Sequence, residues 1–310
     1  MTEEAPEAAA IDIGSNSCRL LIVSRSDGEL MREYYDMEIT RLGKGIEADK
    51  ELTETAEKRT FAALKKFKKE ISTRNISRVK AVGTSALRDA NNAERFCNKI
   101  EKQLSIPVEI VSGRQEAKLV FAGVNSFPRR DVELVIDIGG GSTEVIRGKE
   151  KNELKALSLE MGAVRYTERY IPRPESIVSE KEQELILKAA RDCIEAGSGN
   201  LSKITEIECF FGVGGTITTL AAVAQQMKKY RPEKVENFLL SLSRIEKITK
   251  FLSHKELEER KKIPGLEPER ADVIVAGSLI LAAFMRFFGF SEIRVSDRGI
   301  LFGIIAQYLL

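Results

Sequence analysis

The feature that most constrains this chain is a short stretch in which three glycines lie between two acids. A strand-like Leu-Val-Ile run leads into it, and it reads Asp-Ile-Gly-Gly-Gly-Ser-Thr-Glu over residues 137–144. Glycines let the main chain approach a ligand closely, so that successive N–H groups can point at one anion. The flanking carboxylates are suitable ligands for a hard cation such as Mg²⁺. The stretch predicts a phosphate-binding turn, with a purely structural glycine turn as the alternative.

The residues after the glycines favour a strand over a helix. Thr143, Val145 and Ile146 are β-branched, and such residues are enriched in strands. No Gly-Lys-Ser/Thr sequence follows the glycines, so the P-loop pattern is not met. We therefore predict a hairpin, with the glycines in its turn.

The same pattern occurs earlier in the chain, at an offset of 125 residues. Residues 11–14 read Ile-Asp-Ile-Gly, residues 136–139 repeat them, and Ser17 matches Ser142. A second repeat has an offset of 131 residues, since the Val-Gly at 82–83 recurs as the Val-Gly at 213–214. Four matching residues of strand type can arise by chance, but the shared order and glycine placement favour a duplicated domain.

Strands and helices are expected to alternate after each hairpin. We expect Leu64, Phe67 and Ile71 on the buried face of one helix, and Leu185, Ala189 and Ile194 on that of another. The expected strands are 8–13, 18–24, 29–38, 106–111, 133–138, 142–146, 206–211 and 293–296, and the expected helices are 53–71, 112–121, 180–195, 216–226, 243–252, 267–288 and 298–309.

Two helix starts carry candidate site residues. Ser112 and Gln115 have the spacing of a capping box, which places Glu116 in the first turn of a helix. An acid there stabilises the helix dipole without any catalytic role, so the pattern alone favours a structural reading of Glu116. A glycine-rich loop at 212–215 opens the next helix, where free N–H groups can bind phosphate. Close helix–strand packing is the alternative reason for those glycines.

Two charged features of the second half have ordinary explanations. A basic cluster follows the 216–226 helix and consists of Lys228, Lys229, Arg231 and Lys234. Such clusters usually form a solvated face, and a polyanion track is the alternative. Arg270 and Asp272 lie near the start of the 267–288 helix, where we favour an ion pair over a role in a site.

Composition excludes several functional classes. The chain has 310 residues, enough for two domains, and its net charge of +2 argues against a general nucleic-acid binder. His254 is the only histidine, which disfavours a Ser-His-Asp hydrolase or a histidine-rich metal site. The four scattered cysteines suggest reduced thiols, most of them buried, in the cytosol. An acidic N-terminus and interrupted apolar runs argue against a signal peptide and a membrane span.

With these pieces placed, the chain resembles the exopolyphosphatase / guanosine-pentaphosphate phosphohydrolase (Ppx/GppA) family, in a short two-domain form. That family belongs to the actin/hexokinase/Hsp70 superfamily. The matching segments occur in family order and are 10–17, 83–90, 112–117, 137–144, 212–216 and 296–301. The first, third and fourth of them together are highly specific.

The resemblance implies an α/β fold of two duplicated ribonuclease-H-like (actin-like ATPase) domains with an interdomain cleft. In such a fold, residues 1–125 plus 298–310 form the first domain, because the closing helix is expected to return to it, and residues 126–297 form the second. The sequence pattern itself predicts the boundary at Phe127-Pro128. The resemblance also makes Glu116 the catalytic residue that aligns or deprotonates the attacking water. Asp12, Asp137 and Glu144 match positions near Mg²⁺ or another divalent cation. The phosphate-facing positions are Asn16, Ser17, Arg88, Gly140, Gly141, Ser142, Gly214, Gly215 and Thr216.

This chain departs from the longer family members in two respects. Those members continue into a helical HD-type region, so the long substrate channel built by that region is expected to be absent. Arg19 stands where they place a histidine, and the consequence for substrate choice is open.

We therefore expect a cytoplasmic exopolyphosphatase that releases orthophosphate from the end of polyphosphate, with the turns at 14–17 and 139–142 clamping the terminal phosphates. The alternatives are hydrolysis of guanosine pentaphosphate, a sugar or acid kinase, and a non-catalytic binder of polyphosphate or nucleotide. Neither DNA nor a membrane is expected as a partner, and a homodimer is compatible with the sequence.

Overall fold

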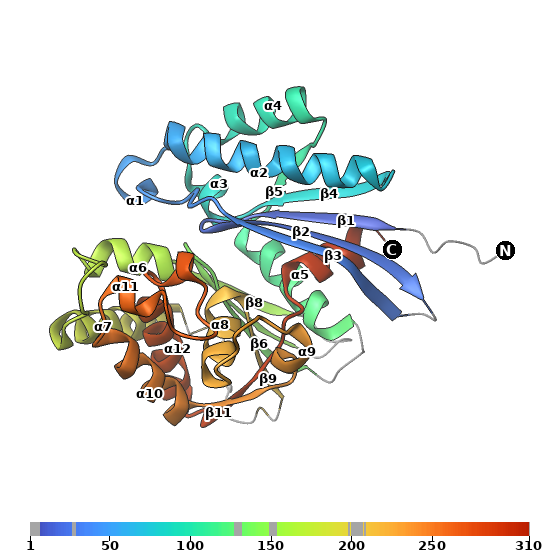
Figure 1. The fold of residues 1–310 in the computed structure, drawn as a ribbon. Coiled ribbons are helices and arrows are strands. Elements are labelled where there is room, and N and C mark those ends of the chain that lie inside the picture. Colours follow the sequence, from blue (N-terminus) through green and yellow to red (C-terminus); the bar gives the residue numbers. More distant parts are fainter. Residues whose placement is uncertain are drawn as a thin grey trace. The chain divides into compact units, whose positions relative to one another are not determined.

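The computed structural model describes residues 7–26, 29–126, 132–148, 154–197, 199, 207 and 209–309. The chain divides into two compact units (Figure 1). One unit comprises Met1–Arg130 with Arg298–Leu310, and the other comprises Asp131–Asp297. The Phe127-Pro128 boundary lies outside the described residues.

The first unit is built on a five-stranded sheet with the order β3-β2-β1-β4-β5. Its strands are β1 (Ala8–Ile13), β2 (Ser17–Ser26), β3 (Glu29–Ile39), β4 (Arg78–Gly83) and β5 (Val108–Ile110). β2 is antiparallel to both of its neighbours, whereas β1, β4 and β5 pair in parallel. All six residues of β1 are buried, as expected of a central strand covered on both faces.

The second unit repeats this topology. Its strands are β6 (Leu134–Ile138), β7 (Thr143–Arg147), β8 (Lys155–Leu159), β9 (Phe210–Val213), β10 (Leu239–Ser241) and β11 (Glu292–Val295). The order β8-β7-β6-β9-β11 reproduces the first sheet, and β10 is added at the edge beyond β11. β7 is again the antiparallel strand beside the central one. The two sheets confirm the predicted α/β fold with a duplicated domain.

Helices cover both faces of the first sheet. They are α1 (Ile46–Asp49), α2 (Glu54–Thr73), α3 (Ser85–Asp89), α4 (Ala93–Leu104), α5 (Gly113–Ser126), α13 (Ile300–Ile304) and a final π-helix (Ile305–Leu309). α2 and α4 lie on one face, while α5 and the C-terminal helices lie on the other (Figure 1). Leu64, Phe67 and Ile71 of α2 are buried as predicted.

The helices α5 and α13 pack against each other through glycines. A Cβ added to Gly303 would lie 1.7 Å from the main-chain oxygen of Leu119, and one added to Gly123 would lie 2.1 Å from that of Gly299. Only residues without a side chain allow the two main chains to come this close. The C-terminal segment also bonds to the first sheet, since Arg78 Nη1 donates to the Leu309 carbonyl at 3.2 Å.

The second unit has seven α-helices and a 3₁₀ turn with assigned bounds among its described residues. They are α6 (Ala163–Tyr170), α7 (Glu180–Gly197), α8 (Gly214–Ala224), α9 (Pro232–Val235), α10 (Leu242–Ser253), α11 (Leu257–Arg260), a 3₁₀ turn (Pro268–Arg270) and α12 (Ile274–Phe288). α12 is the most buried of the long ones, because every residue from Ile274 to Met285 is buried.

Several element boundaries differ from the sequence-based expectations. β9 runs through Val213, so the helix after it starts at Gly214, inside the expected loop. Ser241, and not Ser243, caps α10 by accepting from the Arg244 amide at 3.3 Å. β5 is confined to three residues, and α5 continues to Ser126.

The buried face of α7 and the state of the cysteines also need correction. α7 buries Ile186, Ala190 and Ile194, whereas Leu185 is 44% exposed. All four cysteines are free, but only Cys18 is fully buried. None of the described helices combines the length and the apolar composition of a membrane span.

Candidate functional site

The two predicted turns have the same main-chain geometry. The amide of Gly14 donates to the Ser17 carbonyl at 3.0 Å, and the amide of Gly139 donates to the Ser142 carbonyl at 3.0 Å. Each bond closes the hairpin between a central strand and its antiparallel neighbour. The structure therefore confirms the hairpins, and the sequence repeat becomes a repeat of local structure.

In the second unit, the carbonyls of the glycine turn are bound by the start of α6. The Gly139 carbonyl accepts from the Ala163 amide at 2.9 Å, and the Gly140 carbonyl accepts from the Val164 amide at 2.8 Å. The C=O and N–H directions on the two sides of a trans peptide plane are opposite. The N–H groups of the glycine turn therefore face away from α6, as an anion-binding turn requires.

The first unit holds its turn in a similar way. The amides of Thr40 and Arg41, which follow β3, donate to the Asn16 carbonyl at 3.1 and 2.9 Å. The Gly43 amide donates to the Ser15 carbonyl at 2.8 Å. In both units, the segment after the third strand of the sheet thus fixes the carbonyls of the turn.

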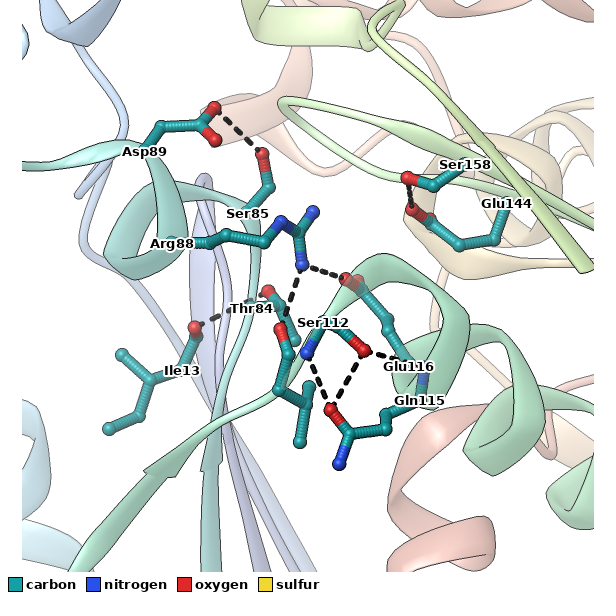
Figure 2. Close-up of polar contacts among 11 residues, drawn as sticks. Ile13, Thr84, Ser85, Arg88, Asp89, Ser112, Gln115, Glu116, Glu144 and Ser158 are labelled. Carbon is teal, nitrogen blue, oxygen red and sulfur yellow. Dashed lines mark hydrogen bonds and ion pairs between the residues drawn. The ribbon is translucent and has the colours of Figure 1, made fainter. Parts of the chain in front are cut away.

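The two acids of the second turn are direct neighbours. Asp137 on β6 and Glu144 on β7 are register partners, and they are 8% and 1% exposed. Ser158 Oγ donates to Glu144 Oε1 at 2.8 Å (Figure 2). Like charges directly opposite each other destabilise a sheet, and a divalent cation would relieve this repulsion. The donor set of two carboxylates fits Mg²⁺, which prefers oxygen ligands.

The equivalent pair in the first unit is an ion pair. Asp12 is the register partner of Arg19, and Arg19 Nε donates to Asp12 Oδ2 at 2.9 Å. Arg19 thus occupies the position that Glu144 has in the second unit. Two buried polar atoms nearby, Asp12 Oδ1 and Asn16 Nδ2, have no hydrogen-bond partner. A buried donor and acceptor left open are costly unless a ligand completes them.

Glu116 lies in the first turn of α5 and is held by an arginine. Arg88 Nη1 donates to Glu116 Oε2 and to the Val111 carbonyl, both at 3.0 Å, so the side chain joins α3 to the start of α5 (Figure 2). The predicted capping box is present, because the Gln115 amide donates to Ser112 Oγ at 3.3 Å and the Ser112 amide donates to Gln115 Oε1 at 2.9 Å. The structure therefore places Arg88, predicted to face phosphate, on the candidate catalytic carboxylate.

The third predicted loop forms the N-terminus of α8. Gly214 has φ +85°, and a Cβ added there would lie 2.1 Å from Asp137 Oδ1. A Cβ on Gly215 would lie 2.0 Å from Arg270 Nη1. Both glycines therefore admit a charged side chain against the first turn of the helix. Arg270 Nε donates to Glu267 Oε2 at 2.6 Å, so Arg270 forms an ion pair with Glu267.

The site residues of each unit follow the carboxyl ends of parallel strands. In the first unit, the Thr84 amide donates to the Ile13 carbonyl at 3.2 Å and the Val111 amide donates to the Gly83 carbonyl at 3.0 Å. These bonds bring the segments after β1, β4 and β5 to one sheet edge. Open α/β sheets bind ligands at this edge.

Sequence reasoning missed the part played by Gly162 and Arg165. A Cβ on Gly162 would lie 2.4 Å from the Gly140 carbonyl oxygen, and Arg165 Nε donates to the Gly141 carbonyl at 2.7 Å. The available signal was a glycine just after the strand that pairs with β7. Among the residues that the structure describes, no cluster of three or more metal-binding side chains is assembled. Of the three predicted metal ligands, Asp137 and Glu144 lie side by side in the second unit, and Asp12 belongs to the first unit.

Comparison with known proteins gives a consistent result. The chain is 35% identical over 311 residues to a bifunctional 3-dehydroquinate synthase/phosphatase of Fusobacterium nucleatum, with 96% of this chain and 46% of the relative covered. It is 29% identical to a guanosine-5'-triphosphate,3'-diphosphate pyrophosphatase of Photobacterium profundum, with 98% and 60% covered. The chain thus spans about half the length of these curated relatives.

A solved structure resembles nearly the whole chain. An exopolyphosphatase from Cytophaga hutchinsonii is 29% identical, has a TM-score of 0.84, and is matched over 96% of both chains. The model of the Ppx/GppA phosphatase family matches residues 21–310. With the repeated sheets, the paired turns and the segments predicted from the sequence, this match shows that the chain belongs to the Ppx/GppA phosphatase family.

Proposed function

We propose that the protein is an exopolyphosphatase, which hydrolyses the terminal phosphoanhydride of polyphosphate with release of orthophosphate. The observation that carries the proposal is the placement of Glu116. Its carboxylate is nearly buried at the sheet edge where ligands bind, and one arginine holds it in a fixed orientation. A glutamate serving only the helix dipole would need neither feature.

Glu116 is the proposed general base. Phosphoanhydride hydrolysis requires that the terminal phosphoryl group be held, that its charge be offset, and that a water be aligned behind it. We assign Glu116 Oε1, the carboxylate oxygen that does not take part in the bond from Arg88, to orienting the water and accepting its proton. General-base assistance of this kind contributes about 10²–10⁴-fold in rate.

The main-chain N–H groups of the turns bind the phosphates in this proposal. The N–H groups of the Gly139–Ser142 turn face away from α6, and the first turn of α8 offers further free N–H groups. Arg270 adds a positive charge against Gly215. In the first unit, Asn16 Nδ2 is an open donor suited to a phosphate oxygen.

Mg²⁺ is the proposed cofactor, and it supplies neutralisation of phosphate charge when it is bound. Asp137 and Glu144 would hold it, since they are a buried pair of like charges on neighbouring strands. Asp12 has one oxygen engaged by Arg19 and one open oxygen, Oδ1.

Hydrolysis of guanosine pentaphosphate is the second candidate. The relative from Photobacterium profundum, named for such an activity, matches 98% of this chain, whereas the structural relative from Cytophaga hutchinsonii is named an exopolyphosphatase. Both substrates end in a phosphoanhydride, so the same glutamate and turns serve either of them.

The test is a measurement of phosphate release with and without Mg²⁺. The substrates are short polyphosphate, long polyphosphate, guanosine pentaphosphate and ATP, each at matched concentrations of terminal phosphate. We expect Mg²⁺-dependent release that is fastest from polyphosphate. Faster release from guanosine pentaphosphate would select the second candidate, and no release from any of the four would overturn the assignment as an enzyme.

A further inference from the structure

The glycine turn of the second unit is backed by a buried arginine. Arg165, in the first turn of α6, is 7% exposed, and its Nε donates to the Gly141 carbonyl at 2.7 Å. Its amide also donates to the Gly140 carbonyl at 3.0 Å. Burying a guanidinium costs free energy, so a buried arginine behind a candidate binding turn suggests that it has a role there.

This bond completes a set of three. The carbonyls of Gly139, Gly140 and Gly141 all accept hydrogen bonds from the first turn of α6, the last of them from a side chain. Each bond turns the N–H of the following residue to the opposite side. Within the described part of the chain, the N–H groups of Gly140, Gly141 and Ser142 make no hydrogen bond.

Two of the three open N–H groups belong to buried residues, which makes the turn more than a surface loop. Gly141 and Ser142 are both buried, and Ser142 is 5% exposed. Buried main-chain N–H groups are almost always paired, and an unpaired one carries a desolvation penalty. Neighbouring N–H groups that point the same way form a concave anion site, so an anion is the partner that removes the penalty.

The main chain of α6 cannot reach the third carbonyl. The amides of Ala163, Val164 and Arg165 are used on the first two carbonyls, and Gly162 already packs directly against the Gly140 peptide. In the first unit, main-chain amides bind the corresponding carbonyls, since those of Thr40 and Arg41 donate to Asn16 and that of Gly43 donates to Ser15. The second unit therefore uses a side-chain donor for the Gly141 carbonyl, whereas the corresponding Asn16 carbonyl of the first unit is bound by main-chain amides.

We propose that Arg165 is a positioning residue for phosphate binding. Its Nε holds the Gly141 carbonyl, and the N–H of Ser142 thereby faces the phosphate together with those of Gly140 and Gly141. The inference rests on the proposed function for its substrate, a phosphoanhydride, but the predicted anion site can be tested with inorganic phosphate or pyrophosphate alone.

Three substitutions separate the hydrogen bond from the charge. Arg165→Gln keeps a planar N–H donor and removes the charge, Arg165→Lys keeps the charge without the planar donor, and Arg165→Met removes both. Arg169→Met, on the exposed side of the same helix, is the matched control. Affinities for phosphate and pyrophosphate are measured by calorimetry, KM and kcat by phosphate release, and folding by thermal unfolding.

We expect Arg165→Met to weaken phosphate and pyrophosphate binding and to raise KM by about ten- to a hundredfold, as for a lost hydrogen bond to a buried carbonyl. Arg165→Gln should recover most of that loss, and Arg169→Met should match the wild type. Equal affinities for Arg165→Met and the wild type would overturn the inference. So would recovery by Arg165→Lys without recovery by Arg165→Gln, since charge alone would then be responsible.

A measurement on the unaltered protein covers the case in which these variants fail to fold. In protein labelled with ¹⁵N-glycine, the amide of Gly140, which is only partly buried, should exchange rapidly with solvent and become protected on adding pyrophosphate. Protection without ligand, or none with it, would refute the predicted direction of the N–H groups. If the wild type binds pyrophosphate in this way and releases no phosphate from any substrate, the proposed function fails and the positioning role stands.

Discussion

Glu116→Gln isolates the chemical role of the candidate base. The substitution changes one oxygen to an amide nitrogen and leaves the shape of the side chain intact. Arg88 Nη1, 3.0 Å from Glu116 Oε2, can still donate to the amide oxygen. A bond to a charged acceptor contributes about 1.5–3 kcal/mol and a neutral one about 0.5–1.5 kcal/mol, so unfolding should become easier by about 1 kcal/mol.

The effect on turnover should be much larger than the effect on folding. Loss of a general base lowers kcat by about 10²–10⁴-fold, which corresponds to about 3–5 kcal/mol of barrier. KM should change little, because the phosphates are bound by the turns. The assay is steady-state phosphate release with polyphosphate, alongside thermal unfolding.

Glu109→Gln provides the control for loss of a glutamate charge in the same unit. Glu109 lies on β5 and pairs with Lys80 at 2.5 Å, away from the proposed chemistry. Its substitution should leave kcat within about twofold of the wild type, because a surface ion pair contributes little to stability. Turnover by Glu116→Gln within tenfold of the wild type, with normal folding, would refute the assignment of Glu116 as the base.

The remaining predictions concern packing, a buried charge and pH. Gly303→Ala should destabilise the first unit by about 3 kcal/mol in denaturant unfolding, because the new Cβ would lie 1.7 Å from a carbonyl oxygen of α5. Gly199→Ala is the control and should be neutral, because a Cβ there would have no atom within 4 Å. Arg19→Met should lower the free energy of unfolding by about 3 kcal/mol, because it leaves the Asp12 carboxylate buried without its ion pair. Adding Asp12→Asn should restore most of this stability. Equal stability of the single and double variants would contradict the prediction. Burial raises the pKa of the Cys97 thiol from 9.0 to about 11. The unfolded chain therefore loses this proton first, so stability should fall as pH rises from 9 to 11, and Cys97→Ala should flatten the profile in that window.

The repeated sequence pattern was sufficient to predict the α/β architecture with its two hairpins. Two copies of Ile-Asp-Ile-Gly, each between β-branched runs, correspond to two hairpins with the same closing bond. The capping box at Ser112 and the periodicity of α2 were also correct, since both depend on residues within two or three turns of each other. Interactions that are local in sequence can be recognised from sequence.

The errors arose where a distant segment decided the local structure. The long helix expected from 267 begins at Ile274, and the Ala271 carbonyl is bound by Arg260 Nη1 at 2.9 Å, so that side chain takes a bond that a helix would use. β9 extends through Gly212 and Val213 because both pair with neighbouring strands. No periodicity within these segments reports such partners.

The site divides in the same way. The sequence pattern alone nominated Asp137, Glu144 and the glycine turns, and the family resemblance added Glu116 as the candidate base. The folded structure was needed to show that Arg88 holds Glu116, that Arg19 neutralises Asp12, and that α6 with Arg165 fixes the direction of the Gly139–Ser142 turn. Glycine composition permits a main chain to bind an anion, but the direction of its N–H groups depends on which donors hold the carbonyls. Those donors lie more than twenty residues away and are supplied by folding.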